Sequence, residues 1–164
     1  MYKAIEIAKY VINYSQKTDS PISNLKLQKL LFYIQAAILV KTGKECFKEP
    51  IMAWEYGPVV REVYDEFKIY GREDIPLQAS SRNLGFDYSK IQIVYQNEEM
   101  SLRTEEMNLI NKVVDAYAKV KNPFELVKKT HSEDPWKNTK RGCEISVDSI
   151  KAYYSIHEEK IYNS

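Results

Sequence analysis

The chain has 164 residues, of which 44% are hydrophobic, so it is long enough to bury a core and suits one domain. Its 24 basic residues nearly balance its 23 acidic residues, which leaves a formal net charge of +1. Because so small a charge offers little long-range attraction to phosphate backbones or anionic membranes, the composition disfavours non-specific binding to either.

The cysteines and the first residues indicate a cytoplasmic protein. Cys46 and Cys143 are too few and too widely separated to suggest a disulfide framework or a metal cluster. The opening MYKAIEIAKY lacks the apolar core of a signal peptide, and no run approaches the roughly 20 apolar residues of a membrane span. We therefore expect residues 1–164 to form a single domain in the cytoplasm.

Two amphipathic helices are predicted at the start of the chain. The first covers residues 2–15, and the loop KTDSPI turns it toward the second. The second begins at Ser23, a capping residue, and ends at Gly43, which can adopt a left-handed backbone conformation. The residues expected to face the core are Ile5, Ala8, Val11 and Ile12 in the first helix and Leu27, Leu30, Leu31, Ile34 and Ile38 in the second.

An aromatic turn, WEYGP at 54–58, follows the second helix. We expect Pro58 to occupy the first position of a third helix, where its missing N–H costs nothing and its fixed φ is suitable. This helix should run to about Tyr70 and close at Gly71. Its expected buried face comprises Val60, Val63, Tyr64 and Phe67.

The second half of the chain predicts three more helices after a weakly patterned stretch. Between residues 72 and 100 the only signal is a partly alternating strand pattern at 89–96. Helices then follow from the Thr104 cap, from the Asn122 cap to about Thr130, and from the Ser146 cap onward. The expected inward residues are Met107, Ile110, Val114 and Tyr117 in the first of these helices and Ile150, Tyr154 and Ile161 in the last. The fold class is therefore mainly α: a compact multi-helix domain with a small β element or irregular insertion around 72–100.

Three segments together resemble a known family. They are SNLKLQKLLFYIQ, EPIMAWEYGPVVREVYDEFKIYG and KKTHSEDPWK, and their order and approximate spacing are similar to those of the Panacea or SocA-like antitoxin domain, which is also met as a phage-associated domain of unknown function. The stretch 72–100 departs from the family pattern. The resemblance implies an antitoxin that binds a cognate protein toxin, usually encoded next door, and blocks it by direct complex formation. It also permits an adaptor route, in which the antitoxin presents its toxin to a cytosolic ATP-dependent protease.

The candidate partner-binding residues are large aromatics and an arginine near the Gly-Pro turn. Trp, Tyr and Arg dominate binding hot spots, because they bury much area and still offer polar tips. The alternative is that the aromatics lock the turn onto the long helix, which is favoured for Trp54 and Tyr64, whereas Arg61 is expensive to bury unpaired and favours a partner contact. The full set of candidates is Trp54, Tyr56, Arg61, Tyr64, His131 and Trp136.

No catalytic, cofactor or metal site is expected. His131 lies beside Glu133 and Asp134 and could serve as an acid-base group or a metal ligand, but Ser132, Asp134 and Pro135 favour a structural turn anchored by Trp136. There is no H-x-x-x-H pattern, no G-x-S-x-G elbow and no Gly-rich phosphate loop, so we expect a protein that is not an enzyme.

A nucleic-acid-binding regulator encoded by a phage or mobile element is the alternative function. The local cluster of Lys137, Lys140 and Arg141 is its best support, although runs of this length are usually solvated surface. The net charge near zero counts against it.

Overall fold

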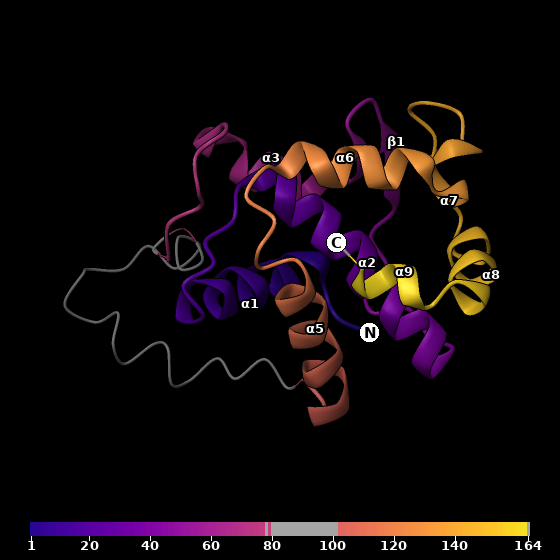
Figure 1. Ribbon diagram of the computed structural model, residues 1–164, viewed down its shortest axis with the longest axis horizontal. Coiled ribbons are helices and arrows are strands. Elements are labelled where there is room, and N and C mark those ends of the chain that lie inside the picture. Colours follow the sequence, from indigo (N-terminus) through magenta and orange to yellow (C-terminus); the bar gives the residue numbers. More distant parts are fainter. Residues whose placement is uncertain (78, 80–101, 164) are drawn as a thin grey trace.

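A central helix, α2 (Asn24–Thr42), organises the molecule, and the other elements surround it (Figure 1). The computed structural model describes residues 1–77, 79 and 102–163. Both predicted ends of α2 are confirmed: the Ser23 side chain accepts a hydrogen bond from the Lys26 N–H, and Gly43 ends the helix in the left-handed conformation at φ 71°. Mainly α architecture is likewise confirmed.

Burial extends around the whole circumference of α2, beyond the predicted stripe. Leu27, Leu30, Leu31, Ile34 and Ile38 are buried, as expected. So are five polar side chains on the other faces of the helix, namely those of Asn24, Lys26, Gln28, Lys29 and Gln35. A helix buried on every side must pair these polar groups internally, because each would otherwise lose its hydrogen bonds to water.

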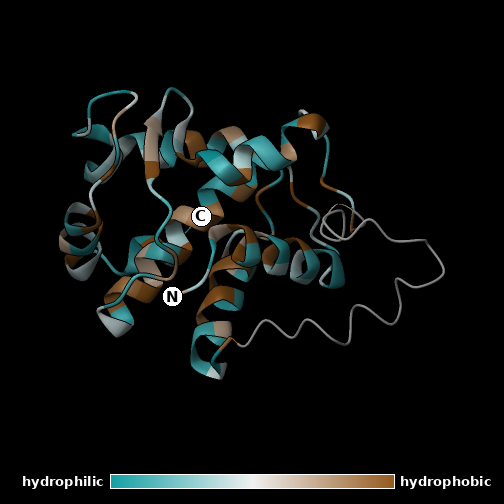
Figure 2. Ribbon diagram, turned by 180° about the vertical axis from the view of Figure 1, so that it is seen from behind, coloured by the Kyte–Doolittle hydropathy of each residue, from teal (hydrophilic) through white to brown (hydrophobic). Residues whose placement is uncertain are grey.

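Helices α1 (Ala4–Lys17) and α5 (Thr104–Ala116) pack against α2 and against each other. In Figure 2, α5, which follows the grey trace, carries hydrophobic and hydrophilic residues in alternation, as an amphipathic helix should. The tyrosines Tyr10 and Tyr14 of α1 donate hydrogen bonds to Asn111 and Asp115 of α5. These bonds join two helices that are far apart in the sequence.

The inward faces of α1 and α5 differ slightly from the prediction. Ile5 is only partly buried, and Ile7 fills the core position instead. Met107 is also partly buried, whereas Ile110, Val114 and Tyr117 are buried as expected. Thr104 is the first helical residue rather than the cap, a shift of one residue that is typical of predicted helix ends.

The aromatic turn is a β-hairpin, so the prediction of a helix beginning at Pro58 is wrong. Strands β1 (Ile51–Trp54) and β2 (Gly57–Val60) are antiparallel, and Trp54 pairs with Gly57 across a two-residue loop. Gly57 has φ 101°, a conformation that suits glycine and that a tight hairpin exploits. Pro58 is tolerated because β2 is an edge strand.

Helix α3 (Arg61–Phe67) begins only after this hairpin and continues into a 3₁₀ turn, η1 (Lys68–Tyr70). Val63 and Phe67, four residues apart, are buried as predicted. Tyr64 is 36% exposed, so its predicted place on the buried face is wrong. The next position along a helix turns by about 100°, which carries this side chain out of the core and toward the hairpin.

The C-terminal elements are α6 (Pro123–Ser132), α7 (Asp134–Lys137), α8 (Val147–Ile156) and α9 (Glu159–Tyr162). The predicted caps are confirmed, since Asn122 accepts from the Phe124 N–H and Ser146 accepts from the Ser149 N–H. The last predicted helix is divided at His157, and Ile161 therefore lies on α9. Its burial, with that of Ile150 and Tyr154, is as expected.

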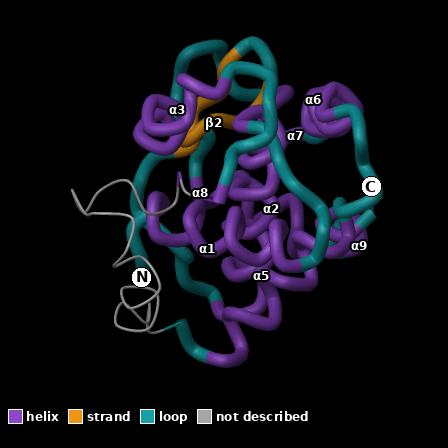
Figure 3. Tube along the Cα trace, turned by 90° about the vertical axis from the view of Figure 1, so that its left-hand side faces the viewer, coloured by secondary structure: helices purple, strands orange, loops and turns teal. Residues whose placement is uncertain are grey.

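Figure 3 shows the two strands at one end of the molecule, with α3 on one side and α6 on the other. Residues Cys143 and Ile145 extend the sheet by backbone hydrogen bonds to Ala53 and Ile51 of β1. The predicted strand at 89–96 lies outside the described residues. Within the described residues, no helix is both long and apolar enough to cross a lipid bilayer.

The Gly57→Ala variant tests whether the hairpin depends on close packing at this glycine. A Cβ at position 57 would lie 2.7 Å from Lys29 Cε and 2.8 Å from Thr130 Oγ1, in addition to the strain of φ 101°. We expect the free energy of unfolding to fall by roughly 2–4 kcal/mol, measured by urea denaturation. Gly43→Ala is the matched control, because its φ is also positive but its Cβ would meet nothing within 4 Å. Equal losses in the two variants would contradict close packing at Gly57.

Candidate functional site

Polar side chains of α2 hold the hairpin and α3 in place. The Gln28 Oε1 atom accepts a hydrogen bond from the Val60 N–H at 2.9 Å, at the junction of β2 and α3. The Asn24 Nδ2 atom donates to the Tyr64 carbonyl at 3.1 Å, and Gln28 Nε2 donates to Asn24 Oδ1. These bonds satisfy buried amides and fix two surface segments against one rigid helix.

Lys29 supports the hairpin from below. Its side chain is fully buried, and its Nζ donates to the Pro58 carbonyl at 3.1 Å. No acidic side chain in the described residues forms an ion pair with it, and burial lowers its pKa to about 7. Gly57 leaves room for this side chain, because a Cβ there would collide with it.

An aromatic cluster covers the outer face of the hairpin. The Trp54 ring packs edge-to-face with Tyr64, with centroids 5.1 Å apart, and the Arg61 guanidinium carbon lies 5.7 Å from the Trp54 ring centroid. At the loop, Tyr56 is 56% exposed and packs edge-to-face against Phe124 of α6. The cluster therefore joins the hairpin, α3 and the start of α6 in one surface.

A second cluster, built on Trp136 of α7, adjoins the first. The His131 ring is stacked on Trp136 at 3.7 Å, and the Arg141 guanidinium carbon lies 3.3 Å from the Trp136 centroid. Two groups this close to one ring must occupy its opposite faces, so Trp136 is sandwiched between them. The Trp136 indole N–H donates to the Trp54 carbonyl at 2.9 Å, which ties the two clusters together.

His131 is placed for packing rather than for chemistry. Burial lowers its pKa, with smaller contributions from the charges of Lys29 and Arg141, while a bond to the Glu55 backbone raises it. Its Nε2 atom is buried without a hydrogen-bond partner in the described part of the chain. This environment favours the neutral imidazole and a structural role in the turn.

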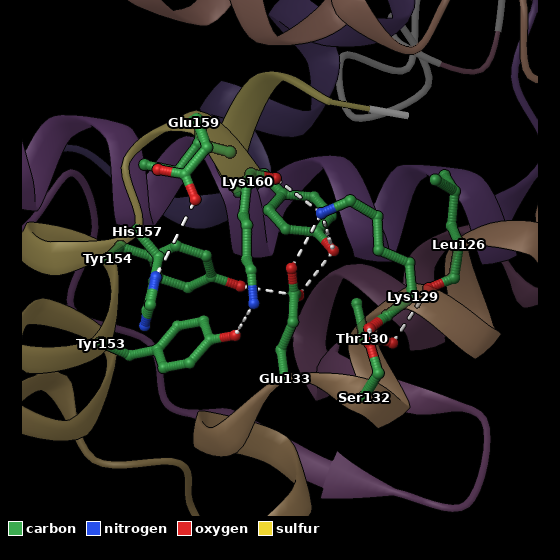
Figure 4. Close-up of polar contacts among 12 residues, drawn as sticks. Leu126, Lys129, Thr130, Ser132, Glu133, Tyr153, Tyr154, His157, Glu159 and Lys160 are labelled. Atoms are coloured by element: carbon green, nitrogen blue, oxygen red, sulfur yellow. Dashed lines mark hydrogen bonds and ion pairs between the residues drawn. The ribbon is translucent and has the colours of Figure 1, made fainter.

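Glu133 points away from His131 and into the core, so the structure separates the histidine from the carboxylate beside it in sequence. The Glu133 carboxylate accepts hydrogen bonds of 2.8 Å from each of Tyr33, Tyr154 and Lys129. Figure 4 shows it between Lys129 and Tyr154, with Lys160 and Tyr153 alongside. Glu133 is only 2% exposed, and its carboxylate has three donors within the protein. This arrangement suits a structural role in holding α6, α8 and α2 together.

A groove of about 510 Å³ lies beside the hairpin. It runs between the start of α2, the hairpin and the α3–η1 segment, and aromatic side chains form much of its wall. The residues that line it are Asn24, Leu25, Gln28, Trp54, Glu55, Tyr56, Val59, Tyr64, Lys68, Gly71 and Gly142. In the described residues, no three His, Cys, Asp or Glu side chains gather as they would around a metal ion.

We call the two clusters together the hairpin surface; its residues are Trp54, Tyr56, Arg61, Tyr64, Phe124, His131, Trp136 and Arg141. All six predicted candidates belong to it. The sequence interpretation missed Phe124 as a contact of Tyr56 and treated Arg141 only as part of a basic patch. It also missed Lys29, because a lysine on a helix face gives no signal that the face is covered.

The fold and the hairpin surface define a small, mainly helical protein with an aromatic-lined groove beside its hairpin. Hydrogen bonds from α2 hold the backbone around this groove in place. By sequence it belongs to the SocA-like antitoxin family: the family described as "Antitoxin SocA-like, Panacea domain" matches residues 27–137, more than half of the chain. That stretch contains α2 from Leu27 onward, the hairpin, α3 and Trp136.

The chain is also similar to "Antitoxin SocA" of Caulobacter vibrioides, with 33% identity over 78 residues. The alignment covers 48% of this chain and 42% of that relative, so it spans less than half of the relative's length. No solved structure matches the chain.

Lys29→Met should remove a pH dependence of stability. The pKa of Lys29 is about 7 in the folded chain, which is below its value in the unfolded chain. Between these two values Lys29 is protonated in the unfolded state and largely neutral in the folded state, so stability rises with pH. From pH 7 to pH 9 this group adds roughly 2 kcal/mol to the free energy of unfolding. Urea denaturation at both pH values should show a wild-type gain larger than that of the variant by this amount. Parallel pH profiles for the two proteins would contradict the buried, uncompensated lysine.

Glu133→Ala should be strongly destabilising. Removing the carboxylate leaves the hydroxyls of Tyr33 and Tyr154 and the ammonium of Lys129 without their acceptor in a buried site. We expect a loss of roughly 3–5 kcal/mol in thermal or urea denaturation. Glu159→Ala provides the control, because its side chain is 59% exposed and its contact with His157 is long, at 3.9 Å. A loss at Glu133 no greater than that at Glu159 would show that the network contributes little.

Proposed function

We propose that this chain is an antitoxin that neutralises a cognate protein toxin by binding it through the hairpin surface. Membership of the SocA-like antitoxin family supports the role, and the curated relative carries the name of an antitoxin. The single structural observation that supports the location is the gathering of all six candidate residues at one end of the molecule.

The hairpin surface has the chemistry of a protein-binding site. Tryptophan, tyrosine and arginine are enriched at binding hot spots, and here they lie partly exposed with their rings held by neighbours. The bonds from α2 hold the backbone beneath them before any partner arrives. Less conformational entropy is then lost on binding, which favours affinity.

We propose a binding role rather than a catalytic one. The Glu133 carboxylate is already saturated by three donors, and the His131 ring is packed against an indole. A general acid or base must instead reach a substrate proton.

The nucleic-acid alternative gains little from the geometry. Arg141, the last residue of the predicted basic patch, lies on the Trp136 ring and donates to the Trp136 carbonyl, so its guanidinium is partly occupied. With a net charge of +1, protein recognition is the better-supported function.

Co-expression with the product of the adjacent gene tests the proposal. That product should arrest growth when expressed alone, and this chain should restore growth and co-purify with the toxin. Failure of either the rescue or the co-purification would contradict neutralisation by direct binding.

Substitutions on the hairpin surface should separate binding from folding. Tyr56→Ala and Arg61→Glu should each raise the inducer concentration needed for growth rescue at least tenfold. Because both side chains are exposed, each variant should change the free energy of unfolding by less than about 0.5 kcal/mol. Matched controls are Ile156→Ala, an exposed apolar residue at the end of α8, and Lys41→Glu at the far end of α2. Rescue by Tyr56→Ala and Arg61→Glu as strong as that of the controls would remove this surface from the interface.

A further inference from the structure

We infer that the groove beside the hairpin binds an apolar side chain of the toxin that is flanked by a carboxylate, with Arg61 holding the carboxylate. This inference rests on the proposed function and names the chemistry of the partner segment. It depends on two observations: an apolar groove whose two buried amide side chains are already paired, and a guanidinium positioned over the tryptophan that forms part of its wall.

The groove favours an apolar group because its two buried amide side chains, Asn24 and Gln28, already have partners. Asn24 donates to the Tyr64 carbonyl, and Gln28 is bonded to Asn24 and to the Val60 N–H. These amides therefore have no need of a ligand. The surface that remains is formed largely by Leu25 and by rings such as those of Trp54 and Tyr64, and burying apolar area against it is favourable.

Arg61 supplies the charge that selects a carboxylate. Its guanidinium lies over the Trp54 ring, and among the described residues no carboxylate forms an ion pair with it. Lys68, the cation that lines the groove, is already paired with Asp65 at 2.8 Å. A guanidinium resting on an aromatic face keeps its planar edge of N–H donors free for a bidentate carboxylate.

Glu55 orients the ligand. This residue of the hairpin loop also lines the groove, and its negative charge disfavours a second acid at the loop. The carboxylate of the partner is thus favoured on the α3 side, next to Arg61, and the rest of the segment extends toward the loop. A phosphate would also suit Arg61, but the apolar wall of the groove and the net charge of +1 favour a peptide.

Two small probes test this chemistry on the full chain without the toxin. N-acetyl-L-phenylalanine and N-acetyl-L-phenylalaninamide share one apolar group, and only the first carries a carboxylate. Titration followed by ¹H–¹⁵N correlation spectra should shift the Val59 and Tyr64 amides and the Trp54 indole N–H. The acid should bind roughly threefold tighter than the amide, as expected for one partly exposed ion pair.

Arg61→Gln should bring the affinity of the acid down to that of the amide, whereas the control Lys41→Gln should retain the wild-type preference. The inference is overturned if the acid binds no tighter than the amide, if Arg61→Gln keeps the preference, or if neither probe shifts the groove signals. Salt-sensitive binding of a single-stranded 20-mer DNA with the same shifts would assign the groove to nucleic acid and also overturn it. Growth rescue by the wild-type chain is independent of these titrations, so failure of the probes leaves the antitoxin function itself intact.

Discussion

The structure depends on the burial of α2 between Lys26 and Leu39 and on the hydrogen bonds that the polar side chains of this helix make to the backbones around it. Burial removes water from all faces of this helix, so each polar group must find a partner within the protein. Gln28, Asn24 and Lys29 meet this requirement by bonding the hairpin and α3. Gln35 does the same for Cys46 and Phe47, and Lys26 for Val120. One helix thereby positions four separate segments.

The burial of Lys29 lowers the stability of the fold, but its hydrogen bond holds the hairpin above it in place. A fully buried lysine without an ion-pair partner in the described residues destabilises the fold at neutral pH, and the lowered pKa of Lys29 reflects this. In return, the Pro58 carbonyl and the close approach of Gly57 fix the hairpin at one position. The rings of Trp54 and Tyr56 are then presented on a backbone that has little freedom to lose.

His131 and Glu133, the residues that the sequence offered as a possible acid-base or metal site, have two different structural roles. His131 packs against Trp136 within the hairpin surface, whereas Glu133 accepts hydrogen bonds from Tyr33 and Tyr154 in a buried network. These two residues are separated by a single position at the C-terminal end of α6, yet they have different partners, so proximity in sequence did not produce a joint site. The side chains of the hairpin surface are aromatic or cationic, and such residues are enriched at protein-binding hot spots.

The sequence by itself determined the helical architecture and the caps at Ser23, Asn122 and Ser146, and it predicted six candidate residues that the structure brings together. Capping and apolar periodicity are local properties that a few neighbouring residues control. Only the tertiary structure decided that WEYGP forms a hairpin rather than a helix start, because the choice depends on the pairing of β1 with β2 and on Lys29 beneath Gly57. The same holds for the exposure of Tyr64, the contact of Tyr56 with Phe124 and the placement of Arg141 on Trp136. These contacts join residues distant along the chain, and no local pattern encodes which surfaces will meet.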